Sequence, residues 1–251
     1  MNLLGLLSGI GICLGGIIGY IPQFYNIIKY DSVEGISEPT LLLMNVGLMC
    51  LTMNSIIFSW QYFFCKNAAC YTNLMPFIQI FFSWVMVLIY YIIFIVYKFK
   101  NKKKKKRIFY GLQYLMTYLI FGIFVIALAL GEKAEGNMKF FSLFADILGY
   151  SSAVLNSLVY LPQIYTLYKL KSRENLSILT YIIQTPGNLI IIFFQAVLYS
   201  SPFSTWVTYV VVLVEQTFIL FLMVYYQCAY QSEDGGGDEE SKENLIDGNY
   251  Y

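Results

Sequence analysis

Seven long apolar runs constrain the fold of this chain more than any other feature of its sequence. The hydrocarbon core of a bilayer is about 30 Å thick, so a helix of roughly 20 apolar residues crosses it. Lipid offers the backbone no hydrogen bonds, and runs of this length therefore cross as helices. We predict an all-α membrane protein with seven transmembrane helices. Short polar segments separate the runs, which are residues 3–28, 39–60, 73–97, 108–130, 140–168, 176–199 and 203–227.

The charged residues gather between these runs and in the tail. They make up 12% of the chain, about half the fraction that is usual in a soluble domain. Eight of the sixteen Lys and Arg fall within residues 98–107, and seven of the fifteen Asp and Glu follow Gln231. The acidic, Gly-rich tail is predicted to be disordered. The net charge of +1 gives no indication of a nucleic-acid partner.

The basic residues also predict the orientation. When the loops are assigned alternately to two sides, thirteen of the sixteen Lys and Arg fall on one side. The other side holds only Lys66, Lys133 and Lys139. Cytosolic loops carry the excess of basic residues, so we predict a lumenal or extracellular N-terminus and a cytosolic C-terminus. The first run has no basic segment before it and no small-residue cleavage site after it, and is expected to be a retained helix.

The chain contains no His, which argues against His-based catalysis, haem ligation and most zinc sites. We therefore expect no enzyme activity, no cofactor and no metal site. Cys65 and Cys70 lie in the polar segment between the second and third runs. Two interpretations stay open for them: a disulfide, if that loop faces an oxidising lumen, or two free thiols.

The chain repeats itself at an offset of 140 residues. Nine of the 21 residues between positions 20 and 40 are identical to those between 160 and 180, without a gap. The shared residues include Pro22-Gln23 and Pro162-Gln163, and the register still holds at Gly47 and Gly187. Such self-similarity indicates two equivalent structural units.

The two copies begin in the first and fifth runs, so four helices separate them and both halves run in the same direction. The sequence therefore predicts two parallel three-helix bundles joined by a linker helix, an arrangement found in transporters. The predicted divisions are a first bundle (1–97), a basic loop with the linker helix (98–130), a second bundle (131–230) and the tail (231–251).

Each copy carries the same extended motif. Tyr-x-Pro-Gln at residues 20–23 and 160–163 is followed at the same distance by Ser-x-Glu-x-x-Ser at residues 32–37 and 172–177. This pairing resembles the signatures of the PQ-loop family, which includes cystinosin, lysosomal cationic-amino-acid exporters and, more distantly, the SWEET sugar carriers.

The resemblance implies a transporter that moves a small polar solute by alternating access, an amino acid or a related solute with proton coupling. The alternatives are a sugar facilitator and a non-transporting cargo receptor or scaffold of the same fold. The resemblance also implies an endolysosomal or vacuolar membrane. The tail supports that address, since Glu240 with Leu245-Ile246 is similar to an acidic dileucine signal.

The motif prolines are the candidate hinges. Pro22 and Pro162 each lack the N–H that an interior helix residue donates, so each leaves a carbonyl free and kinks its helix. Gln23 and Gln163 carry amide donors that can satisfy such carbonyls. By resemblance to the family we expect a hinge in each bundle; a static kink is the alternative.

Candidate substrate-binding residues lie in the sixth run. Pro186-Gly187 is expected to unwind a turn there, and broken helices at mid-membrane often form transporter sites. Gln184, Thr185 and Asn188 would then contact the solute. Asn45, in the second run, corresponds to Thr185; for Asn45 a role in joining helices is an equal alternative.

Two acidic residues inside the runs are candidates for proton coupling. Glu215 lies halfway along the seventh run and Asp146 about two turns into the fifth. An ionised carboxylate at the bilayer centre costs roughly 3 kcal/mol, and no run holds a Lys or Arg in its interior to pair with either residue. Protonation or an aqueous cavity must compensate. For Asp146 an interfacial position is an equal alternative.

The run from Lys102 to Arg107 lies on the predicted cytosolic side. Such clusters attract anionic lipid headgroups; the other interpretation is that the run only fixes the topology. Gln79, Ser83 and Trp84 in the third run and Glu215 in the seventh depart from the neutral polar pair of the sugar carriers, which favours an amino-acid-like solute.

The orientation is directly testable at Asn175, which begins an Asn-Leu-Ser glycosylation sequon. Because the predicted loop is cytosolic, we expect Asn175 to remain unmodified when the chain is expressed in cells that glycosylate lumenal loops. A glycosidase-sensitive shift in gel mobility that is lost in Asn175→Gln would reverse the whole topology.

Overall fold

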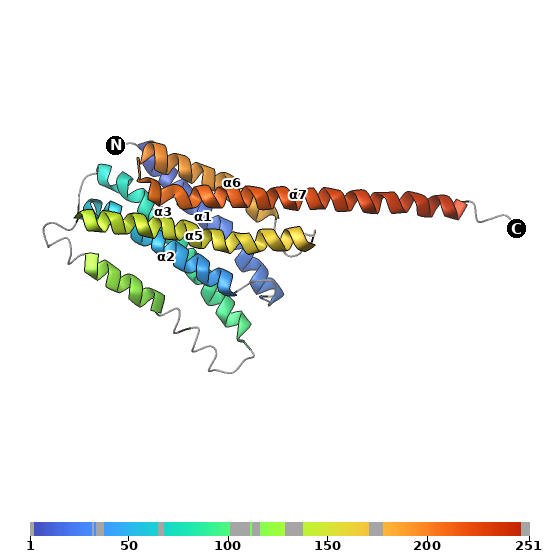
Figure 1. Ribbon diagram of the computed structural model, residues 1–251, viewed down its shortest axis with the longest axis horizontal. Coiled ribbons are helices and arrows are strands. Elements are labelled where there is room, and N and C mark those ends of the chain that lie inside the picture. The colour runs from blue at the N-terminus through green and yellow to red at the C-terminus, as the bar shows by residue number, and fades with distance from the viewer. Residues whose placement is uncertain are drawn as a thin grey trace.

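The computed structural model describes residues 3–31, 33, 38–64, 68–100, 111, 116–128, 138–170 and 178–246, and these are almost entirely helical. Figure 1 shows the elements in their arrangement. In chain order they are α1 (Leu3–Tyr30), α2 (Glu38–Ser59), the 3₁₀ helix η1 (Trp60–Phe64), α3 (Ala68–Lys98), α5 (Met138–Leu170), α6 (Ile178–Phe193), the π-helix η2 (Phe194–Leu198) and α7 (Phe203–Ile246).

The chain is a multi-pass integral membrane protein. Among the described residues, 5 helices are long and apolar enough to span a bilayer, and Gly9–Ile21 and Met116–Leu128 are shorter apolar helices. Many large apolar side chains face outward, including Leu14 and Ile18 on α1. Hydrocarbon solvates such side chains without cost. The full count of seven spans stays a prediction.

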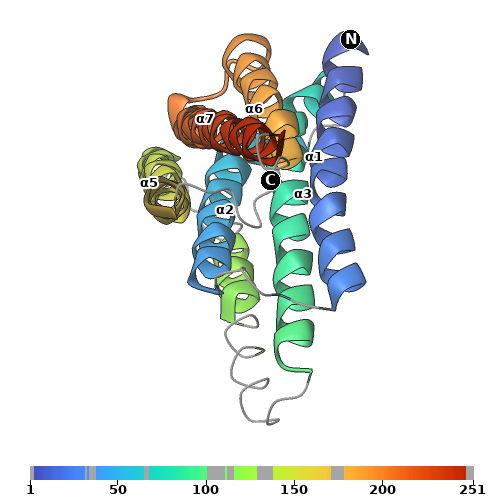
Figure 2. The same ribbon diagram turned by 90° about the vertical axis from the view of Figure 1, so that its right-hand side faces the viewer.

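The helices form a ring of six around the middle of the molecule. In the first half α3 packs between α1 and α2, and in the second half α7 packs between α5 and α6. Two seams join the halves: α2 packs closely on α5, and α1 packs more loosely on α6. In Figure 2, α5 and α7 are seen end-on while α1, α2 and α3 are seen from the side, so the two halves cross at an angle.

The segment Met116–Leu128 lies where the linker helix is predicted. Aromatic contacts hold it against both halves: the rings of Trp84 on α3 and Phe121 are 4.7 Å apart, and those of Phe124 and Phe144 on α5 are 6.1 Å apart. The ammonium of Lys98 forms a 2.7 Å ion pair with the carboxylate of Glu38. This pair connects the end of α3 to the beginning of α2.

The expected break in α6 is wrong. The helix runs without interruption through Pro186 and Gly187 to Phe193. A proline removes one hydrogen bond, whereas an unwound turn in hydrocarbon would expose several backbone groups, so continuity costs less. The irregularity lies two turns later in η2, where the N–H of Tyr199 donates to the carbonyl of Phe194 at 2.9 Å.

The last helix extends into the predicted tail, whose disorder stays a prediction. α7 continues as helix to Ile246 and projects beyond the rest of the bundle in Figure 1. A helix that the membrane span has already nucleated gains one hydrogen bond for each further residue that it fixes.

Equivalent glycines in the two repeats show how the seams differ. Gly9 and Gly149 both lie against the third helix of their own half, touching Met75 and the backbone of Ser204. Gly47 on α2 presses on α5, since a Cβ there would lie 2.7 Å from Nδ2 of Asn156. Its equivalent on α6, Gly187, has nothing within 4 Å of such a Cβ. The α2–α5 seam is therefore closed where the α1–α6 seam is open.

We expect Gly149→Ala to destabilise the protein, because its methyl group would collide with the backbone carbonyl oxygen of Ser204. Forcing an extra methyl group into a packed contact costs about 1–3 kcal/mol. Thermal unfolding in detergent, monitored as the loss of the monodisperse peak in size-exclusion chromatography, should have a lower midpoint temperature than for the wild type. Gly122→Ala is the matched control, since nothing lies within 4 Å of a Cβ at Gly122. Equal midpoints for the two variants would contradict the close α5–α7 packing.

Candidate functional site

A cavity of about 440 Å³ lies inside the ring of helices. It is lined by residues of α1, α2, α3, α5, α6 and α7 and by Phe194 of η2. Ligand-binding cavities in proteins commonly have volumes of about 300–1,000 Å³. Most of the lining is apolar, and none of the described side chains that line it is charged.

The α1 wall of this cavity is made of glycine. Gly11, Gly15, Gly16 and Gly19 line the cavity, and a Cβ at any of them would meet nothing within 4 Å. The missing side chains leave the space that the cavity occupies. Tyr20 follows them as the first motif residue of the first repeat and also lines the cavity.

Four polar residues of the second half form a hydrogen-bonded group in the cavity wall, which we name the Gln216 cluster: Tyr160, Gln184, Asn188 and Gln216. The amide nitrogen of Gln216 donates to the hydroxyl of Tyr160 at 3.0 Å and to Oε1 of Gln184 at 3.1 Å. Nδ2 of Asn188 donates to Oε1 of Gln216 at 2.8 Å. Gln216 therefore links α5, α6 and α7 at the cavity wall.

Gln79 on α3 adds a polar group to the opposite wall. Its side chain is buried, with 3% of the residue exposed, and lines the cavity. Neither its amide nitrogen nor its oxygen has a hydrogen-bond partner among the described residues. An unpaired buried amide costs about 1–3 kcal/mol, and a bound polar molecule would remove that cost.

The predicted substrate residues separate into two groups. Gln184 and Asn188 line the cavity and belong to the Gln216 cluster. Asn45 is turned away from it and accepts a 3.2 Å hydrogen bond from the indole of Trp84, which joins α2 to α3. Thr185 is half-buried outside the cavity lining, and its buried hydroxyl has no hydrogen-bond partner among the described residues.

Glu215 faces α5 rather than the cavity. Ser157 donates a 2.6 Å hydrogen bond to one of its carboxylate oxygens, and the other oxygen has no partner among the described residues. The residue is only 8% exposed. Glu215 therefore lies in the α5–α7 contact, directly beside Gln216 along the chain.

Asp146 belongs to a second network, which we name the Asn54 network. Ser204 donates to the carboxylate of Asp146 at 2.6 Å. Asn54 on α2 donates to Oγ of Ser204 at 3.1 Å and to the carbonyl of Ala145 at 2.8 Å. This network joins the first repeat to the second near the beginnings of α5 and α7.

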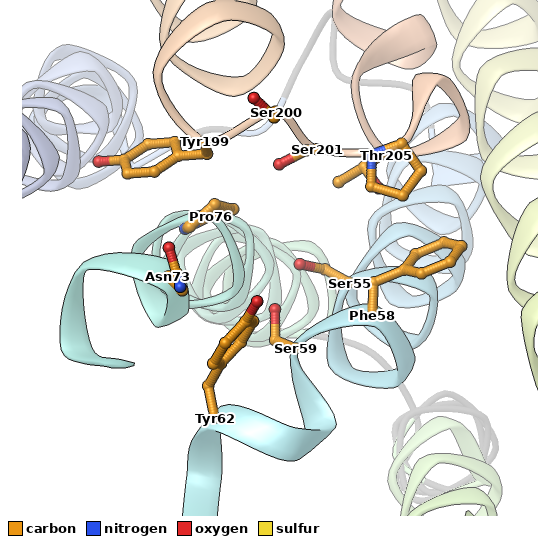
Figure 3. A pocket seen from close by; sticks show the side chains of 11 residues that line it. Ser55, Phe58, Ser59, Tyr62, Asn73, Pro76, Tyr199, Ser200, Ser201 and Thr205 are labelled. Atoms are coloured by element: carbon orange, nitrogen blue, oxygen red, sulfur yellow. The ribbon is translucent and has the colours of Figure 1, made fainter. Parts of the chain in front are cut away.

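A smaller pocket of about 110 Å³ lies at the same end of the molecule. Figure 3 shows Ser55 and Ser59 from the end of α2 and Asn73 and Pro76 from α3 around it, together with Tyr199, Ser200, Ser201 and Thr205. The pocket marks the place where the two repeats meet on the side on which α1 begins. The Asn54 network and this pocket together occupy the end of the inter-repeat interface.

Several predicted residues lie outside what the structure describes. The side chains of Pro22, Gln23, Pro162 and Gln163 are among them, although the backbones of α1 and α5 remain helical there. The basic run 102–107 and Cys65 also lie outside the described residues. Cys70 is disulfide-bonded, whereas Cys13, Cys50 and Cys228 are free. The hinges, the lipid contact and the Cys65–Cys70 pairing stay predictions.

The sequence prediction did not include some of the cavity residues. Tyr160 and its equivalent Tyr20 are the first residues of the two motifs, but only the Pro-Gln that follows was given a role. Gln216 directly follows Glu215, whose charge is the stronger signal in the sequence. Asn156 lies one turn before Tyr160, and this four-residue spacing on one helix face was the available signal.

Comparisons with known proteins agree with the observed repeats. The PQ loop repeat model matches residues 4–64 and 144–204. An uncharacterized protein of Schizosaccharomyces pombe is 25% identical over 244 residues, which cover 86% of this chain and 78% of that protein. A eukaryotic SWEET transporter has 18% sequence identity and a TM-score of 0.54, covering 90% of this chain and 99% of that one. At this identity the SWEET structure shows the fold alone.

Proposed function

Because the chain belongs to the PQ-loop repeat family, with one repeat in each half, we propose that it is a membrane transporter. In this proposal a small solute passes by alternating access through the cavity between the repeats. The observation that carries the proposal is the position of the cavity at the middle of six helices, with the Gln216 cluster in its wall. Transporters built from repeats bind their solutes at such a position.

The lining indicates the chemistry of the solute. Gln79, Asn156, Gln184, Asn188 and Gln216 offer amide donors and acceptors, and none of the described lining residues offers a charge. Such a wall binds an uncharged polar group by hydrogen bonds. A charged group would lose its hydration without gaining an ion pair.

The Asn54 network and the Pro-Gln motifs supply the parts that alternating access requires. The network closes one end of the interface between the repeats with only a few hydrogen bonds. Each such bond contributes about 1 kcal/mol, so the contact can open and re-form. Rocking about Pro22 and Pro162 would separate the repeats at this end and bring them together at the other.

Gln216→Leu tests the transporter proposal. It removes the amide that joins Tyr160, Gln184 and Asn188. Loss of one or two hydrogen bonds to a solute or its site corresponds to about a tenfold weaker interaction. We expect uptake into proteoliposomes, screened with sugars, neutral amino acids and cationic amino acids, to fall about tenfold for whichever solute the wild type accumulates.

Gln195→Leu is the control for that experiment. Gln195 is also fully buried and has no side-chain partner among the described residues, but it does not line the cavity. It should transport like the wild type. Normal transport by Gln216→Leu would remove the cavity from the transport path. Failure of the wild type to move any solute, with specific binding retained, would favour the cargo-receptor alternative.

A proton-coupled amino-acid exporter in an endolysosomal or vacuolar membrane is the second candidate, and Glu215 favours it. Its carboxylate is buried, has one oxygen without a described partner, and neighbours Gln216. Among the described residues no Lys or Arg forms an ion pair with it. A proton taken up by this group would be released when the α5–α7 contact becomes hydrated.

Glu215→Gln keeps the volume and the hydrogen bond with Ser157 but cannot change its charge. We expect it to abolish uptake driven by a pH gradient and to leave solute exchange without a gradient intact. Asp146→Asn should have the smaller effect, because that residue lies near the end of the bundle. An unchanged dependence of uptake on pH in Glu215→Gln would exclude this residue as the coupling site.

A further inference from the structure

The central cavity lies between α1 and α6, the two neighbouring helices of the ring that pack most loosely on each other. Ile183 and Ile190 on α6 line the cavity, yet their exposed fractions are 43% and 48%. On the facing helix, Gly11, Gly15 and Gly16 also line the cavity and are exposed. Residues that belong both to a cavity wall and to the outer surface mark an opening. This opening faces the surface that contacts lipid.

The repeat shows that this opening is not a general property of the fold. Gly47 and Asn156 are in contact in the closed α2–α5 seam. At an offset of 140 residues, Gly47 corresponds to Gly187 and Asn156 corresponds to Gly16, and these two residues lie in the α1–α6 seam. Asn156 fills the space over Gly47, with Nδ2 at 2.7 Å from the position of a Cβ. Gly16 has no side chain, and nothing lies within 4 Å of a Cβ at Gly187. The second repeat closes the α2–α5 seam with the side chain of Asn156, and the first repeat has Gly16, without a side chain, at the equivalent position.

The lining of the cavity combines apolar and polar groups. The α1 glycines and the α6 isoleucines at this seam are apolar, whereas the Gln216 cluster and the unpartnered amide of Gln79 supply polar groups to the same cavity. A ligand that fits has an uncharged or internally neutralised polar head and an apolar chain. A water-soluble solute is poorly soluble in hydrocarbon and would not reach the cavity through an apolar opening in the bilayer.

We propose that the cavity takes its substrate laterally from the membrane, and that the substrate is an amphiphile with a neutral or zwitterionic head and a hydrocarbon chain. The head binds at Gln79 and the Gln216 cluster while the chain remains in the α1–α6 seam and in the bilayer. The proposal rests on the transporter function above and names its substrate class. The chain costs little to accommodate, since bilayer hydrocarbon and apolar side chains solvate it equally well.

Lipid translocation in proteoliposomes tests this. Phosphatidylcholine vesicles with a trace of NBD-labelled phosphatidylcholine receive dithionite, which bleaches only probe in the outer leaflet. With wild-type protein we expect the protected fluorescence to disappear faster than in protein-free vesicles. NBD-phosphatidylserine should move more slowly, because no described lining residue carries a charge to pair with its anionic head.

Gly187→Leu and Gly15→Leu fill the opening without colliding with anything within 4 Å of the new Cβ. Leu is also a better helix former than Gly. We expect both variants to lose lipid translocation to the level of protein-free vesicles, with thermal unfolding midpoints at or above that of wild type. Gly122→Leu makes the same change in the segment Met116–Leu128, at a position that is equally open and does not line the cavity. It should translocate lipid normally.

Two results would overturn the lateral route: translocation no faster than in protein-free vesicles, or translocation that persists in Gly187→Leu. Uptake of water-soluble solutes, measured on the same vesicles, separates this failure from failure of the transporter proposal. A protein that accumulates a sugar or an amino acid but moves no lipid is a transporter with an aqueous substrate. A protein that moves neither contradicts both proposals.

Discussion

Polar groups inside a bilayer must find their hydrogen-bond partners within the protein, and the buried polar residues of this chain lie where helices meet for that reason. Trp84 donates to Asn45 and joins α2 to α3. Ser157 donates to Glu215 between α5 and α7. Asn54 crosses from the first repeat to the second. Because little hydrophobic force drives helices together in lipid, these bonds and close glycine contacts set which helices are neighbours.

The same requirement makes the exceptions informative. Gln79 is buried in a cavity wall with both amide atoms unpaired among the described residues, and Gln216 uses its amide to join three others at the same cavity. Gln195 is also buried and unpaired among the described residues, but of these two glutamines only Gln79 lines the cavity. The central cavity is therefore a place at which the fold leaves hydrogen-bonding capacity that a ligand can reach.

The ring of six helices follows from the two repeats, and the cavity follows from the sequence differences between them. Each repeat places its third helix between the other two, so the halves pack through two equivalent seams. The seams would be alike if the repeats were identical. Asn156 fills one of them and Gly16 leaves the other unfilled. Gly11, Gly15 and Gly19 on α1 likewise correspond to larger residues on α5, namely Ser151, Leu155 and Val159. These differences account for the looser α1–α6 seam on which the proposed lateral route depends.

The sequence by itself determined the membrane class, the two parallel repeats and part of the site. The length of the apolar runs and the gapless repeat are properties of the sequence itself, so they can be recognised before the fold is known. Gln184 and Asn188 were predicted from a helix break at Pro186-Gly187 that does not form, and both nevertheless line the cavity. Only the tertiary structure decided that α6 stays continuous through Pro186, that Glu215 turns toward Ser157, and that Gln216 faces the cavity. Adjacent residues on a helix point about 100° apart, so which of them faces a cavity depends on where the neighbouring helices lie.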